Sequence, residues 1–257
     1  MRGFVSFSLG GYVLTAAVRD RLVLSLILCI AVGAGLSLFL GSAGVIEKTQ
    51  FSVVYAAGGL RFVGLAGLVL FSVFYLRRAF ETRDVEYLLS RPISRCAFLM
   101  SHAAAFSLIA VLIACAVVFS VFAINPKGFG AGHLLWAASI AAEYVVMANA
   151  ALFFAMVVSS GSGAAMATMG LYVLARLMGE LLGIAHQPLG IAGEGTMNIV
   201  MQAVSLIVPR LDLFGQTAWL IYPPDGTISY GFIALQAALY SALLMAASLV
   251  DLSRRQF

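Results

Sequence analysis

The run LVLSLILCIAVGAGLSLFL, residues Leu22–Leu40, contains no charged side chain. With a rise of about 1.5 Å per residue, a helix of this length crosses the ~30 Å hydrocarbon core of a bilayer. Five further apolar runs follow it along the chain of 257 residues. The chain is 62% hydrophobic and 10% charged, whereas about 25% of the residues of a soluble domain are charged. We therefore predict an all-α membrane protein with six transmembrane helices.

The predicted protein is a single transmembrane domain over residues 1–257. Its six spans are predicted at about 22–40, 54–76, 97–124, 134–158, 164–184 and 228–250. Residues 1–21 place apolar side chains on one helical face, which predicts a helix lying in the membrane interface. Residues 185–227 are too apolar for an ordinary loop, and Pro209 and Pro223 interrupt them. We expect short re-entrant or surface helices there.

Basic residues are distributed unevenly between the two sides of the predicted membrane. If the N-terminus is inside, the inner segments hold ten arginines, and the outer segments hold only Lys48, Lys127 and Arg210. Cytoplasmic segments are enriched in Lys and Arg, so we predict that both termini are cytoplasmic. The net charge of +4 comes from these membrane edges. It indicates contact with membrane lipid and gives no reason to expect a nucleic acid partner.

The longest polar interval on the predicted cytoplasmic side is Arg77–Ser101, RRAFETRDVEYLLSRPISRCAFLMS. Its centre, Val85–Leu89, has helical spacing, and Pro92 prevents this helix from continuing. Burial of an exposed side chain such as Leu88 against a partner contributes roughly 1.5–3 kcal/mol. A short amphipathic helix between two spans is suited to receive force from a soluble partner. The alternative is a solvated helix whose arginines only anchor the spans.

The order of these features resembles that of ABC-2 family permeases, the membrane subunits of certain ABC transporters. Residues Leu88–Arg95, LLSRPISR, are similar to the family's Leu-Leu-x-x-Pro-(Val/Ile)-Ser-Arg segment. The lead Val18–Leu22 and the six-span layout are also similar, and Pro209–Phe214 resembles the permeases linked to multicopper enzyme maturation, including nitrous oxide reductase assembly. The chain departs from the family at Thr82–Asp84, where a Gly-Thr pair is common.

This resemblance implies a subunit that exports a substrate across the bacterial inner membrane as a homodimer. A separate cytoplasmic ATPase would dock on the coupling region, residues 77–96, and a periplasmic accessory protein is a further implied partner. The implied docking residues are Glu86, Tyr87, Leu88, Leu89, Arg91, Pro92 and Arg95. The substrate stays open, as do two other functions: a secondary ion-coupled carrier, and a membrane assembly or signalling protein that moves no solute.

No phosphate-binding loop of the Gly-rich type followed by Lys occurs in the sequence, and such a loop is what lets backbone amides approach a nucleotide. Both lysines, Lys48 and Lys127, lie in predicted outer segments. We therefore expect no cofactor and no catalytic residue on this chain, and we assign ATP and Mg²⁺ to the partner ATPase.

Four ionisable residues lie within the predicted spans: Arg61, Glu143, Arg176 and Glu180. Charges inside a membrane are costly, and they are functional candidates for that reason. All four are predicted in the outer half of the membrane, and Arg176 and Glu180 are spaced i, i+4 on one helical face. They either line a translocation route or form ion pairs that only fix helix packing.

Metal and disulfide chemistry has little support in the sequence. Cys29, Cys96 and Cys115 have no paired spacing, and His102 is isolated in the third span. A lone histidine of this kind is more often hydrogen-bonded than metal-bound. We predict no metal site and no disulfide framework.

Overall fold

The computed structural model describes residues 7–19, 21–42, 48–82, 94–126, 129–185, 194–224 and 226–254. Within these ranges every regular element is a helix or a 3₁₀ turn. Six helices are long and apolar enough to cross a membrane. Their bounds are α2 Arg21–Ser42, α3 Lys48–Glu81, α5 Arg95–Ile124, α6 Ala131–Val157, α7 Gly161–Ala185 and α9 Tyr230–Arg254. The prediction of an all-α membrane protein with six transmembrane helices is confirmed.

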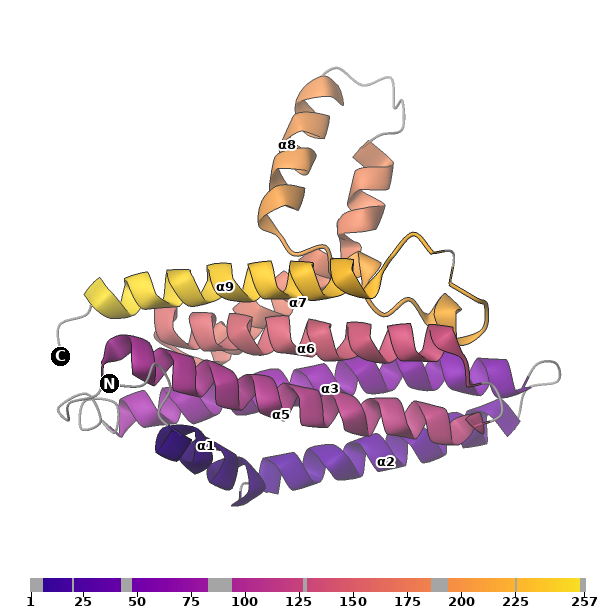
Figure 1. The fold of residues 1–257 in the computed structure, drawn as a ribbon, viewed down its shortest axis with the longest axis horizontal. Coiled ribbons are helices and arrows are strands. Elements are labelled where there is room, and N and C mark those ends of the chain that lie inside the picture. Colours follow the sequence, from indigo (N-terminus) through magenta and orange to yellow (C-terminus); the bar gives the residue numbers. More distant parts are fainter. Residues whose placement is uncertain are drawn as a thin grey trace.

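The helix α6 is the centre of the bundle. It packs against α3, α5, α7 and α9, and it is the most buried of the six spans, whereas α9 is the least buried. Figure 1 shows α2, α3, α5, α6 and α9 running alongside one another, with α1 and the C-terminal end of α9 toward the same end of the bundle. An even number of crossings between α1 and the end of α9 requires this arrangement.

The helix α3 is longer than the predicted span 54–76. It runs unbroken for 34 residues, about 50 Å, and takes in Lys48 at one end and Arg77–Glu81 at the other. The apolar run predicted only the part of α3 that crosses the membrane. The helix continues past it because Arg, Ala, Phe and Glu all tolerate helical backbone. The first residues of the predicted coupling region are therefore the last turn of α3.

The other ends of the spans have local causes. Ser94 caps α5, since its Oγ accepts a hydrogen bond from the backbone N–H of Ala97 at 3.1 Å. Ser160 does the same for α7 through the N–H of Gly163, also at 3.1 Å. Side-chain oxygens of this kind satisfy amides that have no acceptor within the helix. The two caps set where α5 and α7 begin.

The N-terminal helix α1, Phe7–Arg19, agrees with the helix predicted over residues 1–21. It packs against α5 and α2 and buries Val13 and Ala17 completely or nearly so. Tyr12 and Val18, on its other faces, are exposed. This is the one-sided pattern of an amphipathic helix, and its position at the membrane surface stays a prediction.

The segment between α7 and α9 contains the helix α8, Glu194–Ile207, and the 3₁₀ turns η2, Leu211–Leu213, and η3, Thr217–Leu220. Residues Ile199–Ile207 and Leu211–Leu220 meet at a bend of 73°. In Figure 1, α8 and the C-terminal turns of α7 stand out sideways from the bundle; we call this pair the arm. The two turns fold back onto the bundle, where Leu211, Phe214 and Leu220 are buried.

Candidate functional site

A buried ion pair joins two of the predicted intramembrane charges. Arg61 on α3 donates from Nε to Oε1 of Glu143 on α6 at 2.9 Å, and its Nη2 pairs with Oε2 of the same carboxylate. The two residues are 3% and 0% exposed. Two parallel N–H···O contacts between a guanidinium and a carboxylate give strong, directional pairing. The pair fixes α3 against α6.

The same guanidinium also holds the segment after η2. Arg61 donates from Nη1 to the carbonyl of Gly215 at 2.8 Å and from Nη2 to that of Phe214 at 3.2 Å. Arg176 on α7 donates from Nη1 to the carbonyls of Leu211 and Phe214, at 2.7 and 2.6 Å. The carbonyl of Leu211 also accepts the backbone N–H of Phe214 at 3.1 Å, whereas those of Phe214 and Gly215 lie beyond the 3₁₀ turn. Buried carbonyls need donors, and two arginines from two spans supply them.

Glycine is required at two places around this cluster. Gly215 has φ +53°, and a Cβ there would lie 2.8 Å from Nη1 of Arg61. At Gly64 a Cβ would lie 2.5 Å from the hydroxyl of Tyr144. That hydroxyl donates to the backbone carbonyl of Arg61 at 2.7 Å. The absent side chains let the turn and the tyrosine approach α3 closely.

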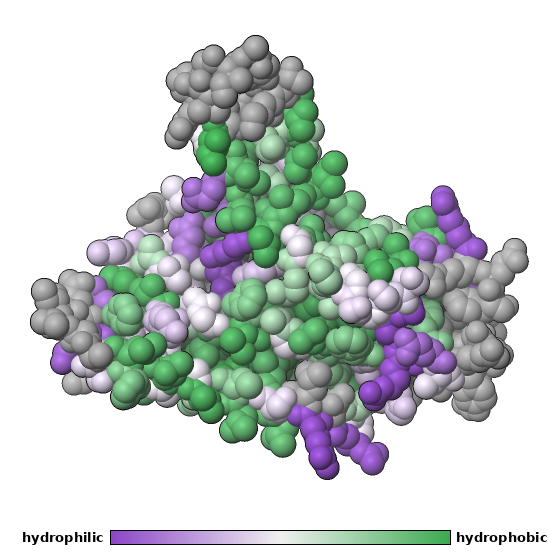
Figure 2. Space-filling model, turned by 180° about the vertical axis from the view of Figure 1, so that it is seen from behind, coloured by the Kyte–Doolittle hydropathy of each residue, from purple (hydrophilic) through white to green (hydrophobic). Residues whose placement is uncertain are grey.

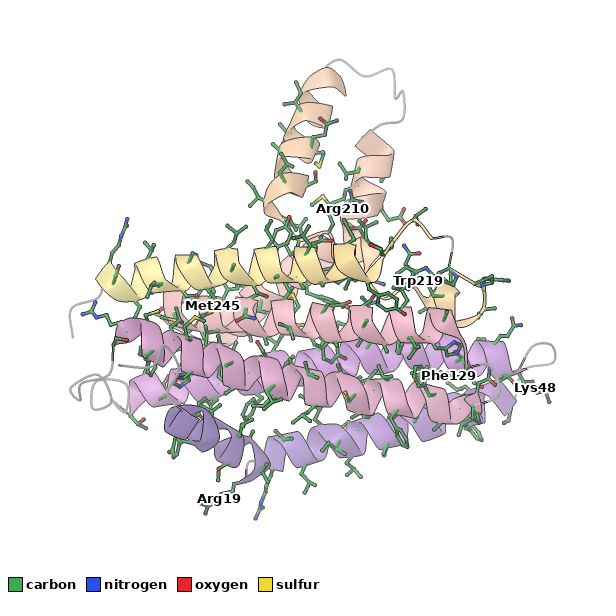
Figure 3. All side chains as sticks on the ribbon, in the orientation of Figure 1. Arg19, Lys48, Phe129, Arg210, Trp219 and Met245 are labelled. Carbon is green, nitrogen blue, oxygen red and sulfur yellow. The ribbon has the colours of Figure 1, made fainter. Side chains whose placement is uncertain are left out.

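A second ion pair lies beside the cluster, outside the spans. Arg210 donates from Nε to Oδ1 of Asp212 at 3.1 Å and from Nη2 to Oδ2 at 2.7 Å. This hydrogen bonding raises the pKa of Arg210 above its ordinary value, so the side chain stays charged. Asp212 packs against α7, since a Cβ on Gly179 would lie 2.6 Å from its Oδ2. Figure 3 shows Arg210 at the foot of the arm.

The foot of the arm is also tied to α9. The hydroxyl of Tyr240 lies 3.2 Å from the carbonyl of Leu206 and 3.1 Å from that of Val208, so one proton is shared between the last turn of α8 and the residue after it. Trp219 and Leu220, in η3, are buried near the start of α6 (Figure 3). The segment from 206 to 220 is therefore held by α3, α6, α7 and α9 together.

The structure brings together three of the four predicted intramembrane charges. Arg61, Glu143 and Arg176 share the contacts above, whereas Glu180 is exposed. In the described part of the chain Glu180 forms no ion pair with Arg176, although the two residues have the i, i+4 spacing. The physical reason is that Arg176 points to the carbonyls of the turn. The sequence could not indicate this competing acceptor.

The predicted docking residues fall mostly outside the described ranges. This applies to Glu86, Tyr87, Leu88, Leu89, Arg91 and Pro92. Arg95 is described: it is the first residue of α5, and its Nη1 donates to the carbonyls of Leu252 and Ser253 on α9, both at 2.9 Å. Docking of an ATPase on these residues stays a prediction.

His102 is buried, and its Nδ1 lies 2.9 Å from the carbonyl of Phe98. The ring packs against that of Phe98, with centroids 4.3 Å apart. This environment accounts for the histidine without a ligand. Among the described residues no group of three His, Cys, Asp or Glu side chains could hold a metal ion.

Sequence reasoning missed the partners that decide what these charges do. The acceptors are main-chain carbonyls of Leu211, Phe214 and Gly215, which every sequence position carries and no residue type marks. Gly215, directly after the run Pro209–Phe214, was the only available signal. These contacts can position the turn after η2, and Glu143 neutralises the buried Arg61. The second arginine, Arg176, is half-buried.

No protein-family model matches the chain, and no curated protein matches its sequence. The function is therefore inferred from the layout of the spans and from the contacts described above.

Proposed function

We propose that this chain is the permease subunit of an ABC-2 type transporter, which exports a substrate across the bacterial inner membrane using a separate ATPase. Both termini and residues 83–93 are then cytoplasmic, and the arginine cluster lies toward the outer surface. Three features support the proposal: the six-span layout, an amphipathic helix before the first span, and the similarity of Leu88–Arg95 to the family's coupling segment.

The observation that carries the proposal furthest is the contact between Arg95 and α9. Arg95 directly follows the proposed coupling segment, and it donates to the carbonyls of Leu252 and Ser253, in the last turn of α9. A cation at a helix C-terminus also interacts favourably with the helix dipole. Force applied to residues 83–93 would therefore move α5 and α9 as one unit. A coupling segment requires such a mechanical connection.

The proposed permease is a homodimer, in which two copies of the chain meet through the arm. The arm carries exposed apolar side chains, among them Leu206 and Ile207, which are 80% and 79% exposed. Figure 2 shows hydrophobic residues over both sides of the arm below its tip. A surface of this kind, projecting sideways from the bundle, is suited to pack against the same surface of another copy in a two-fold arrangement.

The test reconstitutes the full chain in proteoliposomes with an ABC ATPase that co-purifies with it. We expect vanadate-sensitive ATP hydrolysis that requires the chain, and we expect Leu88→Asp with Leu89→Asp to abolish this stimulation and the co-purification of the two subunits. The matched control is Tyr222→Asp, an exposed apolar side chain (66%) beyond η3, which should leave both unchanged. Normal ATPase stimulation by the double variant would refute the coupling role.

A secondary carrier is the main alternative, because Glu143 and Arg61 lie within the spans. Such a carrier would need Glu143 to exchange a proton or ion during each cycle. The complete burial of Glu143 and its two contacts with Arg61 favour a fixed ion pair instead. Solute uptake driven by an ion gradient in proteoliposomes that lack the ATPase would support the carrier and contradict the permease.

A further inference from the structure

A cavity of about 400 Å³ lies between the C-terminal part of α3 and the start of α7. It is at the end of the bundle where α3 and α9 end (Figure 1). One part of its wall is aromatic, formed by Phe71, Phe74 and Tyr75, and the other is charged, formed by Arg77, Arg78 and Glu81. This change from aromatic to basic side chains within two helical turns is typical of the level at which a span leaves the hydrocarbon.

One cationic side chain in this cavity has an unsatisfied donor within the described ranges. The Nε atom of Arg77 is buried and has no hydrogen-bond acceptor among the described residues. Across the described ranges, neither Arg77 nor Arg78 forms an ion pair with Glu81, although the spacing would allow it. A buried guanidinium N–H without an acceptor is costly. An anion in the cavity would remove that cost.

The start of α7 adds to the positive potential. Gly161, its first residue, lines the cavity, and a Cβ at this position would lie 3.0 Å from Cε1 of Phe74 and 3.7 Å from Cγ of Arg77. The absence of a side chain lets the helix N-terminus approach Phe74 closely, and this places it beside Arg77. The first amides of a helix have no acceptor within it and favour negative charge.

We propose that this cavity binds the phosphate of an anionic glycerophospholipid, with the acyl chains lying along the exposed faces of Phe74 and Leu70. These side chains are 46% and 41% exposed and lead from the charged wall toward the apolar part of α3. Basic pockets between transmembrane helices at a membrane surface are suited to acidic lipid headgroups. The charged wall comes from the first residues of the predicted coupling region, the last turn of α3, but lipid binding there does not require the transport role.

The experiment measures lipid binding to the purified full chain by native mass spectrometry. The probes are dioleoyl phosphatidylglycerol and dioleoyl phosphatidylcholine, which share acyl chains and differ in headgroup charge. We expect the wild type to prefer phosphatidylglycerol. Arg77→Gln should lower the affinity for phosphatidylglycerol about five- to tenfold, because one cation and one charge-assisted hydrogen bond are lost. It should not change the affinity for phosphatidylcholine.

Glu81→Gln is the decisive variant. It removes the negative charge from the cavity wall, so it should strengthen phosphatidylglycerol binding, and a gain of binding cannot result from misfolding. The control is Arg254→Gln, which removes an exposed arginine from α9 at the same end of the bundle; its affinity should equal that of the wild type.

Three results would overturn the proposal. The first is equal affinity for the two lipids in the wild type. The second is an Arg77→Gln variant that matches Arg254→Gln, or a Glu81→Gln variant without any gain. The third is competition by soluble glycerol 1-phosphate at the concentration at which the lipid binds, because this would assign the cavity to a free phosphate ester.

Discussion

Arg61 on α3 and Arg176 on α7 donate hydrogen bonds to one common acceptor, the carbonyl oxygen of Phe214, at 3.2 and 2.6 Å. Two cations are thereby held close together in the low-dielectric part of a membrane protein. Glu143 neutralises one of them. The arrangement makes the turn after η2 dependent on both helices and makes Glu143 necessary for their close approach.

Replacing Glu143 by Gln should therefore lower the stability of the folded chain. Removing one partner of a buried ion pair costs about 3–5 kcal/mol, because the remaining charge is left uncompensated. The measurement is thermal unfolding in detergent. Glu180→Gln is the matched control, since Glu180 is exposed, and it should unfold at the wild-type temperature. Equal unfolding temperatures for the two variants would contradict the structural importance of the pair.

Gly215→Ala should destabilise the chain more than Gly226→Ala. Both glycines have positive φ, +53° and +73°, so each alanine costs about 1–2 kcal/mol of backbone strain. At Gly215 the new Cβ would also lie 2.8 Å from both Arg61 Nη1 and Ile140 Cδ1, whereas at Gly226 it would meet nothing within 4 Å. Comparing the two variants separates the cost of the contact with Arg61 from the cost of the positive φ, which both share. Equal decreases in unfolding temperature would argue against a contribution from that contact.

Arg176→Met should loosen the turn without unfolding the bundle. The carbonyls of Leu211 and Phe214 lose their donor from α7, while Phe214 keeps its bond to Arg61. Amide hydrogen exchange of residues 211–216 should become faster, and exchange in α6 should not change. Arg210→Met is the control for loss of a nearby arginine, and it should affect this turn less.

Arg95→Gln should free the C-terminal turn of α9 from α5. The loss of two charge-assisted hydrogen bonds at a half-buried site costs about 1 kcal/mol. Faster amide exchange of residues 249–254 should report this loss, with Arg254→Gln as a control that removes a positive charge from the same turn of α9. If the proposed function is correct, Arg95→Gln also lowers transport per ATP hydrolysed. Unchanged exchange would mean that the contact does not tether α9.

A cysteine at Ile207 should cross-link two copies of the chain. In a two-fold interface a residue near the axis meets its own equivalent, and a disulfide needs Cβ atoms about 4 Å apart. The background carries Cys29→Ala, Cys96→Ala and Cys115→Ala. Phe119→Cys, on α5, is the control because its side chain is comparably exposed, at 74%. If the Ile207→Cys variant gives no disulfide-linked dimer, the two-fold interface does not lie at Ile207.

The spans were predictable because membrane insertion depends on length and apolarity, and both can be counted in a sequence. Their ends were less predictable. Arg77–Glu81 were predicted as the start of the coupling region, after the end of the second span, but they continue α3, since helix formation does not stop where hydrophobicity does. Pro209 was a correct sign of a break: α8 ends two residues before it, at Ile207.

The candidate site was predictable in its charges and not in its pairing. Arg61, Glu143 and Arg176 stand out because charge within a span is costly. Which charges meet depends on the rotation of α3, α6 and α7 about their axes. It also depends on a turn 150 residues from Arg61, whose acceptors are main-chain atoms. Helical spacing suggested Arg176 with Glu180, but tertiary contacts gave Arg176 other acceptors.

The unbroken length of α3 connects the two ends of the molecule. Arg61 and Arg77 lie on this one continuous helix, about 24 Å apart along its axis. A tilt of α3 by about 5° about Arg61 would shift Arg77 by about 2 Å. If α3 tilts as one body, an anion bound at Arg77 would also change the hydrogen bond that Arg61 donates to the carbonyl of Phe214.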